Sequence, residues 1–162
     1  MLWVVLIIFS SLIIGRSEDD EPTAANENST DLYMTALTVS PTTVTTREFS
    51  ACSFYIRNDG PDLLSNEYLQ VDYYLSTDSS FDDTADIKIG DTGFTLSIAS
   101  EGSYQINLNL NGLENMVRSW PVDEPAGDYY LFATVAIVYP PPSDPDSSNN
   151  YVRAASVITY SP

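Results

Sequence analysis

Apolar and polar side chains alternate along most of the chain after residue 30, and this two-residue period restricts the fold more than any other feature. A period of two puts successive side chains on opposite faces of a β-strand, whereas a helix needs a period of about 3.6. The pattern predicts strands over Leu32–Val39, Phe49–Arg57, Leu69–Ser76, Ile87–Ile89, Phe94–Ile98, Tyr104–Leu110, Tyr129–Tyr139 and Tyr151–Tyr160. About seven to eight strands, with no convincing helix, predict an all-β, immunoglobulin-like antiparallel β-sandwich.

The same alternation indicates which side chains face the core. We expect one buried face from Cys52, Phe54 and Ile56, a second from Leu69, Val71, Tyr73 and Leu75, and a third from Tyr104, Ile106, Leu108 and Leu110. Tyr129 and Leu131 have the spacing of a tyrosine corner and the inter-sheet residue that follows it, or are simply two buried neighbours on one strand face. Cys52 is the only cysteine and is expected to be a small core residue.

The N-terminus has a different character from the rest of the chain. Met1–Ile14 is apolar but shorter than the roughly 20 residues that span a bilayer, and Gly15-Arg16-Ser17 offers a small-x-small cleavage site. We therefore expect residues 1–17 to be a signal peptide or membrane anchor, residues 18–30 a disordered acidic linker, and residues 31–162 one domain. The protein is then secreted or on the cell surface. A lipid anchor is disfavoured, because Arg16 stands where similar bacterial lipoprotein leaders carry Cys.

Charge restricts the partners and the chemistry. The chain has 23 acidic residues, 6 basic residues and no His, for a net charge of −17. We expect no nucleic acid partner because phosphate binding needs a cationic face, and we expect contact with a membrane only through the N-terminal segment. Without His, a Ser-His-Asp or Cys-His catalytic arrangement cannot form, so we expect no enzyme. A solvated acidic surface and binding of divalent cations both remain open as reasons for the charge.

The acidic run Ser76–Asp91 is the candidate metal site. Neighbouring carboxylates repel one another unless a cation separates them, and Ca²⁺ takes six to eight oxygen ligands at about 2.3–2.6 Å. Phe81, inside the run, is expected to plug the loop into the core. The alternative is an exposed turn that is rich in Asp because Asp caps turns. The predicted Ca²⁺ ligands are Asp78, Asp82, Asp83 and Asp86, joined by Asp144 and Asp146 from a second acidic segment.

Three aromatic residues are candidates for ligand binding. Trp120, Tyr68 and Tyr74 could form a platform for sugars, because ring faces stack on the apolar faces of sugars. The alternative for Trp120 is a place in the core or in a loop plug.

Several motifs together resemble one known family. LTVSPTTV (residues 37–44), YYLSTD (residues 73–78), Phe81-Asp82, DIKIG (residues 86–90) and Asn149-Asn150 follow the order of a CARDB domain, the cell adhesion related domain found in bacteria. The resemblance covers residues 31 to about 160. It departs from the family in the spacing from Asp82 to Asp86, which is one residue longer, and in Pro145 between Asp144 and Asp146. It implies an immunoglobulin-like fold on exported or surface proteins, with a role in adhesion.

Three functions follow as hypotheses. The first is an exported, non-enzymatic surface adhesion or interaction module that is stabilised by calcium and binds protein or glycan. The second is a carbohydrate-binding module. The third is a structural subunit that self-associates through exposed edge strands.

Overall fold

The computed structural model describes residues 30–46, 48–109, 123–139, 144 and 146–162. The predicted leader and all but the last residue of the linker lie outside these ranges. The described residues form β1 (Leu32–Ser40), β2 (Thr43–Val44), β3 (Ala51–Asn58), β4 (Leu64–Ser76), β5 (Ile87–Ile98), β6 (Gly102–Asn109), β7 (Gly127–Tyr139), the 3-10 helix η1 (Ser147–Asn149), β8 (Tyr151–Arg153) and β9 (Ile158–Tyr160). Among them we find no helix with the length and apolar character needed to cross a membrane.

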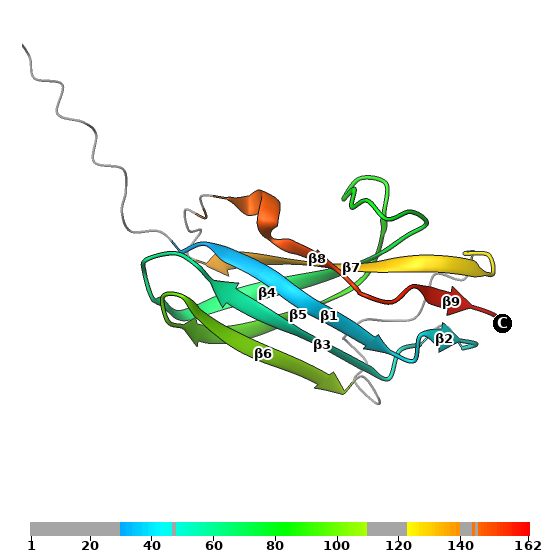
Figure 1. Ribbon diagram of the computed structural model, residues 1–162, viewed down its shortest axis with the longest axis horizontal. Helices are drawn as coiled ribbons and strands as arrows, with labels where there is room; N and C mark the ends of the chain where they lie inside the picture. The colour runs from blue at the N-terminus through cyan, green and yellow to red at the C-terminus, as the bar shows by residue number, and fades with distance from the viewer. Residues whose placement is uncertain (1–29, 47, 110–122, 140–143, 145) are drawn as a thin grey trace, which may run out of the picture.

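Two sheets pack face to face (Figure 1). The smaller sheet has the order β1-β3-β6, and the larger has the order β2-β9-β7-β4-β5 with β8 beside β7. All strand pairs are antiparallel except β2 and β9, which run parallel. The chain therefore folds as the predicted all-β, immunoglobulin-like sandwich.

The core lies between the two sheets, where the alternation places it. Cys52, Phe54 and Ile56 on β3 are buried, as are Leu69, Val71, Tyr73 and Leu75 on β4. Phe54 contacts Tyr73 across the sandwich, edge to face, with ring centroids 6.3 Å apart. Both faces that were predicted from the period of two are thus confirmed, because each strand has one side against the opposite sheet.

The third predicted face is wrong at its first residue. Ile106 and Leu108 on β6 are buried, but Tyr104 is 47% exposed. It lies opposite the buried Ile56, on the core-facing side, yet β6 is the edge strand of its sheet, so no further strand of the described residues covers the ring. Leu110 lies outside the described residues.

Besides shifts of one or two residues at other strand ends, the strands differ from the predicted ones in four places. Strand β4 begins at Leu64, residues 87–98 form one strand instead of two, residues 151–160 form two short strands instead of one, and β2 was not predicted. Gly90 and Gly93 do not interrupt β5 because both are paired with β4, although the register shifts directly after the Tyr73–Gly90 pair. The short strands escape a period-based prediction because two or three residues are too few to show a period.

Tyr129 forms the tyrosine corner. Its side chain is buried, and its hydroxyl donates a 2.8 Å hydrogen bond to the carbonyl oxygen of Pro125, four residues upstream. Leu131, two residues further on, is also buried. The sequence left two interpretations open, a tyrosine corner or simply two buried neighbours on one strand face, and this hydrogen bond identifies the corner.

Asn58, at the end of β3, ties together segments that are far apart in the sequence. Its side chain is fully buried, and its oxygen accepts from the backbone N–H of Asp31 (3.2 Å) and of Gly60 (3.1 Å). Its amide donates to the carbonyl oxygens of Asp62 at 2.7 Å, Ile98 at 3.3 Å and Ala99 at 3.4 Å. One side chain thus satisfies buried backbone groups at the start of β1, after β3 and at the end of β5.

Candidate functional site

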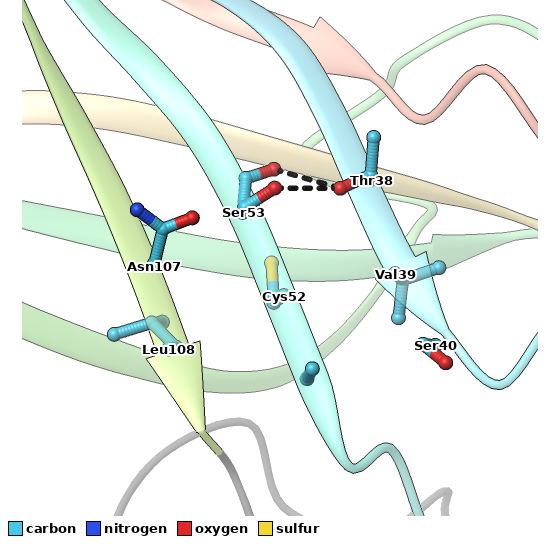
Figure 2. Close-up of a pocket in the computed structure, with 8 residues that line it drawn as sticks. Thr38, Val39, Ser40, Cys52, Ser53, Asn107 and Leu108 are labelled. Atoms are coloured by element: carbon cyan, nitrogen blue, oxygen red, sulfur yellow. Dashed lines mark hydrogen bonds between the residues drawn. The ribbon is translucent and has the colours of Figure 1, made fainter.

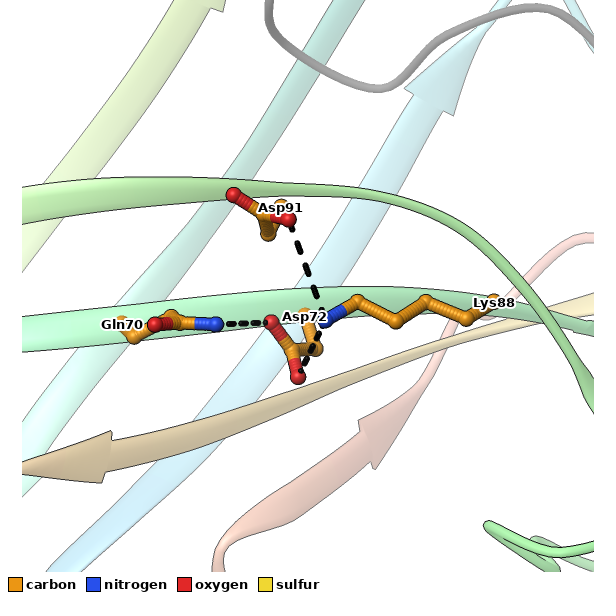
Figure 3. Close-up of polar contacts among 4 residues, drawn as sticks. All are labelled: Gln70, Asp72, Lys88 and Asp91. Atoms are coloured by element: carbon orange, nitrogen blue, oxygen red, sulfur yellow. Dashed lines mark hydrogen bonds and ion pairs between the residues drawn. The ribbon is translucent and has the colours of Figure 1, made fainter.

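The outer face of β4 and β5, which we call the β4–β5 face, carries a row of polar side chains (Figure 3). Lys88, the only lysine of the chain, places its Nζ 2.9 Å from Asp72 Oδ2 and 3.8 Å from Asp91 Oδ2. Gln70 donates from Nε2 to the other oxygen of Asp72 at 2.8 Å. The hydrogen bond to Asp72 raises the pKa of Lys88 above its ordinary value. The row is therefore held in one arrangement while its ends remain open to solvent.

Tyr68 lies at the far end of the same face and is 45% exposed. Its ring lies against Gly93 on the neighbouring strand, where any Cβ would collide with the phenol group. Gly93 is also the register partner of Gln70. The missing side chain at Gly93 thus makes room for an aromatic ring beside the polar row.

Tyr74 is on the same strand but is partly buried. Its ring meets Phe81 edge to face at a centroid distance of 5.2 Å. Burial, followed by the charge of Asp72, raises the pKa of its phenol. The structure therefore does not join Tyr74 to Tyr68 in a common open platform. Trp120, the third predicted platform residue, lies outside the described residues.

Phe81 anchors the acidic loop, but not where we expected. It packs on Phe132 and Tyr151 with ring centroids 5.5 Å and 5.1 Å away, on the outer side of the larger sheet. Phe132 is buried, yet it is not part of the core cluster between the sheets. The expectation that Phe81 packs into the core is therefore wrong. Phe81 instead belongs to a second, separate aromatic cluster, which is formed by Tyr74, Phe81, Phe132 and Tyr151.

The carboxylates of the acidic loop accept hydrogen bonds within their own turn. Asp78 accepts from the backbone N–H of Ser80 at 2.7 Å, and Asp86 accepts from that of Asp82 at 2.9 Å. Asp82 accepts from the N–H and hydroxyl of Thr84 at 2.9 and 2.6 Å, and these bonds lower the pKa of its carboxyl. Asp83 is exposed. These are the contacts of the turn-capping alternative.

The second acidic segment lies before β8. Asp146 caps η1 by accepting from the N–H of Ser148 at 3.1 Å, while Asp144 accepts from the side-chain amide of Asn150 at 2.8 Å. The side-chain oxygens of Asn149 and Asn150 are buried and have no hydrogen-bond partner among the described residues. No three Cys, Asp or Glu side chains of the described residues gather in a way that could hold a metal ion. The Ca²⁺ site stays a prediction.

A cavity of about 240 Å³ lies where β1, β3 and β6 meet (Figure 2). Cys52 lines it, together with Thr38 and Ser53, whose hydroxyl groups are 2.7 Å apart. Burial raises the pKa of the Cys52 thiol to about 12, so the thiol is protonated at neutral pH and is a poor nucleophile. The predicted role of Cys52 as a buried core residue is confirmed.

Comparison with known proteins gives matches among solved structures. No family model and no curated protein matches the sequence. The chain is similar to the CARDB domain of a Pyrococcus furiosus protein, solved in complex with di-metal ions, at 14% identity and a TM-score of 0.46 over 83% of this chain and 90% of that one. CARDB domain structures are among those that this chain resembles.

Two further matches differ in how much of the other protein they cover. A domain of a protein described as a cell-surface protein from Methanosarcina acetivorans has 19% identity and a TM-score of 0.48, over 83% of this chain and 94% of that one. A β-D-glucoside glucohydrolase from Trichoderma reesei has 12% identity and a TM-score of 0.43, over 82% of this chain but 19% of the enzyme.

Proposed function

We propose that this chain is a non-enzymatic adhesion or interaction module of an exported protein, secreted or displayed at a cell surface, and that the β4–β5 face contacts its partner. The apolar segment Met1–Ile14 and the cleavage site after it support export. The exposed ring of Tyr68 beside an ordered polar row supports the contact face. A partly exposed aromatic ring next to fixed polar groups is a common composition of binding surfaces.

A carbohydrate is the second candidate function, and Tyr68 is the observation that favours it. The hydroxyl end of its ring lies over Gly93, and the exposed part of the ring offers an aromatic surface to the C–H groups of a sugar. Gln70 and Asp72 lie two and four residues further along β4, on the same side. Amide and carboxylate groups at that position can bind the hydroxyl groups that surround the apolar face of a sugar.

We predict that Tyr68→Ala weakens glycan binding by about tenfold or more, because it removes the stacking surface and leaves the polar row in place. The measurement is a glycan array with the wild-type chain, followed by calorimetric titration of the best ligand. Tyr55→Ala is the matched control, since Tyr55 is also partly exposed, at 36%, but is on the smaller sheet. If the wild type binds no glycan, the carbohydrate candidate is wrong; if both variants bind like the wild type, the face is wrong.

Calcium is the cofactor that we propose, and we propose that it binds at the end of the molecule that carries the acidic loop. A ligand that binds only the native state raises the unfolding midpoint, so millimolar Ca²⁺ should raise it. Thermal unfolding followed by circular dichroism, with Ca²⁺ and then with EDTA, measures the shift. Asp82→Asn keeps the side-chain oxygen that accepts from Thr84 but loses the negative charge, so it should fold normally and respond less. An unchanged wild-type midpoint would rule out calcium stabilisation.

A further inference from the structure

Among the described residues, strand β6 is an open edge of the smaller sheet. Within the described ranges it pairs only with β3, in an unbroken register from Ala51 opposite Asn109 to Asn58 opposite Gly102. Figure 1 shows β6 at the outer side of that sheet, away from β1. An unbroken register means a regular strand, so the backbone groups on its free side form a regular row.

The other edges carry features that discourage pairing with another strand. The register of β1 with β3 shifts between Thr35 and Thr38, and β5 has a register shift with β4 and charged side chains at Lys88 and Asp91. Strand β2 has two residues. Charges, bulges and short length are the usual protections of an edge strand. The sequence of β6, GSYQINLN, has no charged residue and no Pro, and its ladder has no bulge.

The hydrogen bonds of β3 show which groups of β6 point outward. The N–H of Asp59 donates to the carbonyl of Asp31 at 2.8 Å, and the carbonyl of Ser53 accepts from the Thr38 hydroxyl. The backbone N–H and C=O groups of the odd-numbered residues of β3 therefore point toward β1. Successive residues of a central antiparallel strand alternate between its two neighbours. The backbone groups of the even-numbered residues of β3 therefore point toward β6, where they pair with even-numbered residues. The backbone groups of the odd-numbered residues Ser103, Gln105 and Asn107 of β6 then point to the open side.

The side chains of β6 match a second copy of the same strand. Tyr104, Ile106 and Leu108 are on the core-facing side, and Gln105 and Asn107 are on the solvent side. In an antiparallel pair of two copies, apolar side chains meet apolar ones and amides meet amides. The exposed ring of Tyr104 would then be covered. Because β6 is neutral, it is also a place where two chains of charge −17 can approach without like charges opposite each other.

We propose that β6 pairs antiparallel with β6 of a second copy across a two-fold axis, which joins the two smaller sheets into one continuous sheet. This contact is self-complementary and therefore closes at a dimer. It uses the opposite side of the sandwich from the β4–β5 face, so it does not depend on the proposed glycan site. The net charge of each copy opposes association, and salt screens that repulsion.

Sedimentation velocity of the exported protein tests the proposal. We expect a monomer–dimer equilibrium that shifts toward the dimer as salt rises from about 0.1 to about 1 M, where the Debye length falls from about 10 to about 3 Å. Gln105→Lys should raise the dissociation constant about tenfold or more, because it places like charges near the two-fold axis. Thr95→Lys is the matched control, with the same change of charge on an exposed residue of β5.

Gln105→Pro removes an outward N–H and should also give a monomer, and circular dichroism shows whether it still folds. A wild type that stays monomeric at all salt concentrations overturns the proposal. So does equal dimerisation of the two lysine variants, or growth into open polymers instead of dimers. Glycan binding by Gln105→Lys, measured in parallel, should equal that of the wild type, so the two proposals can fail separately.

Discussion

Asn58→Asp should lower the free energy of unfolding by about 3 kcal/mol at pH 7, although the side chain changes little in size. The amide of Asn58 donates to three backbone carbonyl groups and is fully buried. A carboxylate has no donor, so those carbonyl oxygens would lose the amide donor of residue 58 and face a buried negative charge. Urea unfolding followed by circular dichroism measures the loss.

The dependence of this loss on pH identifies its cause. Burial next to carbonyl oxygens raises the pKa of the introduced carboxyl in the folded state above its unfolded value. The protonated form is then favoured by folding, so the variant recovers stability below the unfolded pKa and loses it as pH rises through the folded pKa. The difference from the wild type should therefore be smaller at pH 4 than at pH 7. A difference that does not vary with pH would contradict the buried-charge explanation.

Asn66→Asp is the control for charge alone. Asn66 is exposed on β4, away from the β6 edge, and the same substitution there should change the free energy of unfolding by about 0.5 kcal/mol or less. If both variants lose similar amounts, the effect comes from the net charge of the chain and not from the hydrogen bonds of Asn58.

Local pattern explains why the faces of β3 and β4 could be predicted and the role of Asn58 could not. Alternation is a property of a few neighbouring residues, so it identifies Phe54 and Tyr73 as core residues from the sequence alone. Asn58 stands in a run, Asn-Asp-Gly-Pro, that indicates a turn in any protein. What distinguishes it is a contact with Ile98, 40 residues away, and no local pattern contains that information.

The candidate site shows the same limit. The sequence shows how many carboxylates the acidic loop has. It cannot show that Asp82 accepts a hydrogen bond from Thr84 instead of lying beside another carboxylate. Tyr68 and Tyr74 have the same parity on β4, so the sequence places them on one face. Only the fold shows that Phe81 covers Tyr74 and that Gly93 leaves Tyr68 open.

The second large effect is expected for Phe81→Ala, at about 2 kcal/mol of unfolding free energy. Phe81 covers Phe132, which is 1% exposed although it points away from the core between the sheets. Removing the ring exposes Phe132 to water and leaves the acidic loop without its only described aromatic anchor. Phe81→Leu keeps part of the apolar contact and should lose about half as much.

Hydrogen exchange separates loss of the anchor from general destabilisation. The backbone N–H groups of Thr84 and Ala85 bond only within the loop, to Asp82, so their protection depends on the loop keeping its shape. In Phe81→Ala they should exchange faster by more than the N–H groups of β3 do, because the loop can open without unfolding the sandwich. Asp83→Ala, in the same loop but exposed, should leave both rates near those of the wild type. Uniformly faster exchange throughout the domain would mean that the aromatic cluster stabilises the whole sandwich. Unchanged exchange in the loop would mean that the turn hydrogen bonds of Asp82 and Asp86 keep the loop in shape without Phe81.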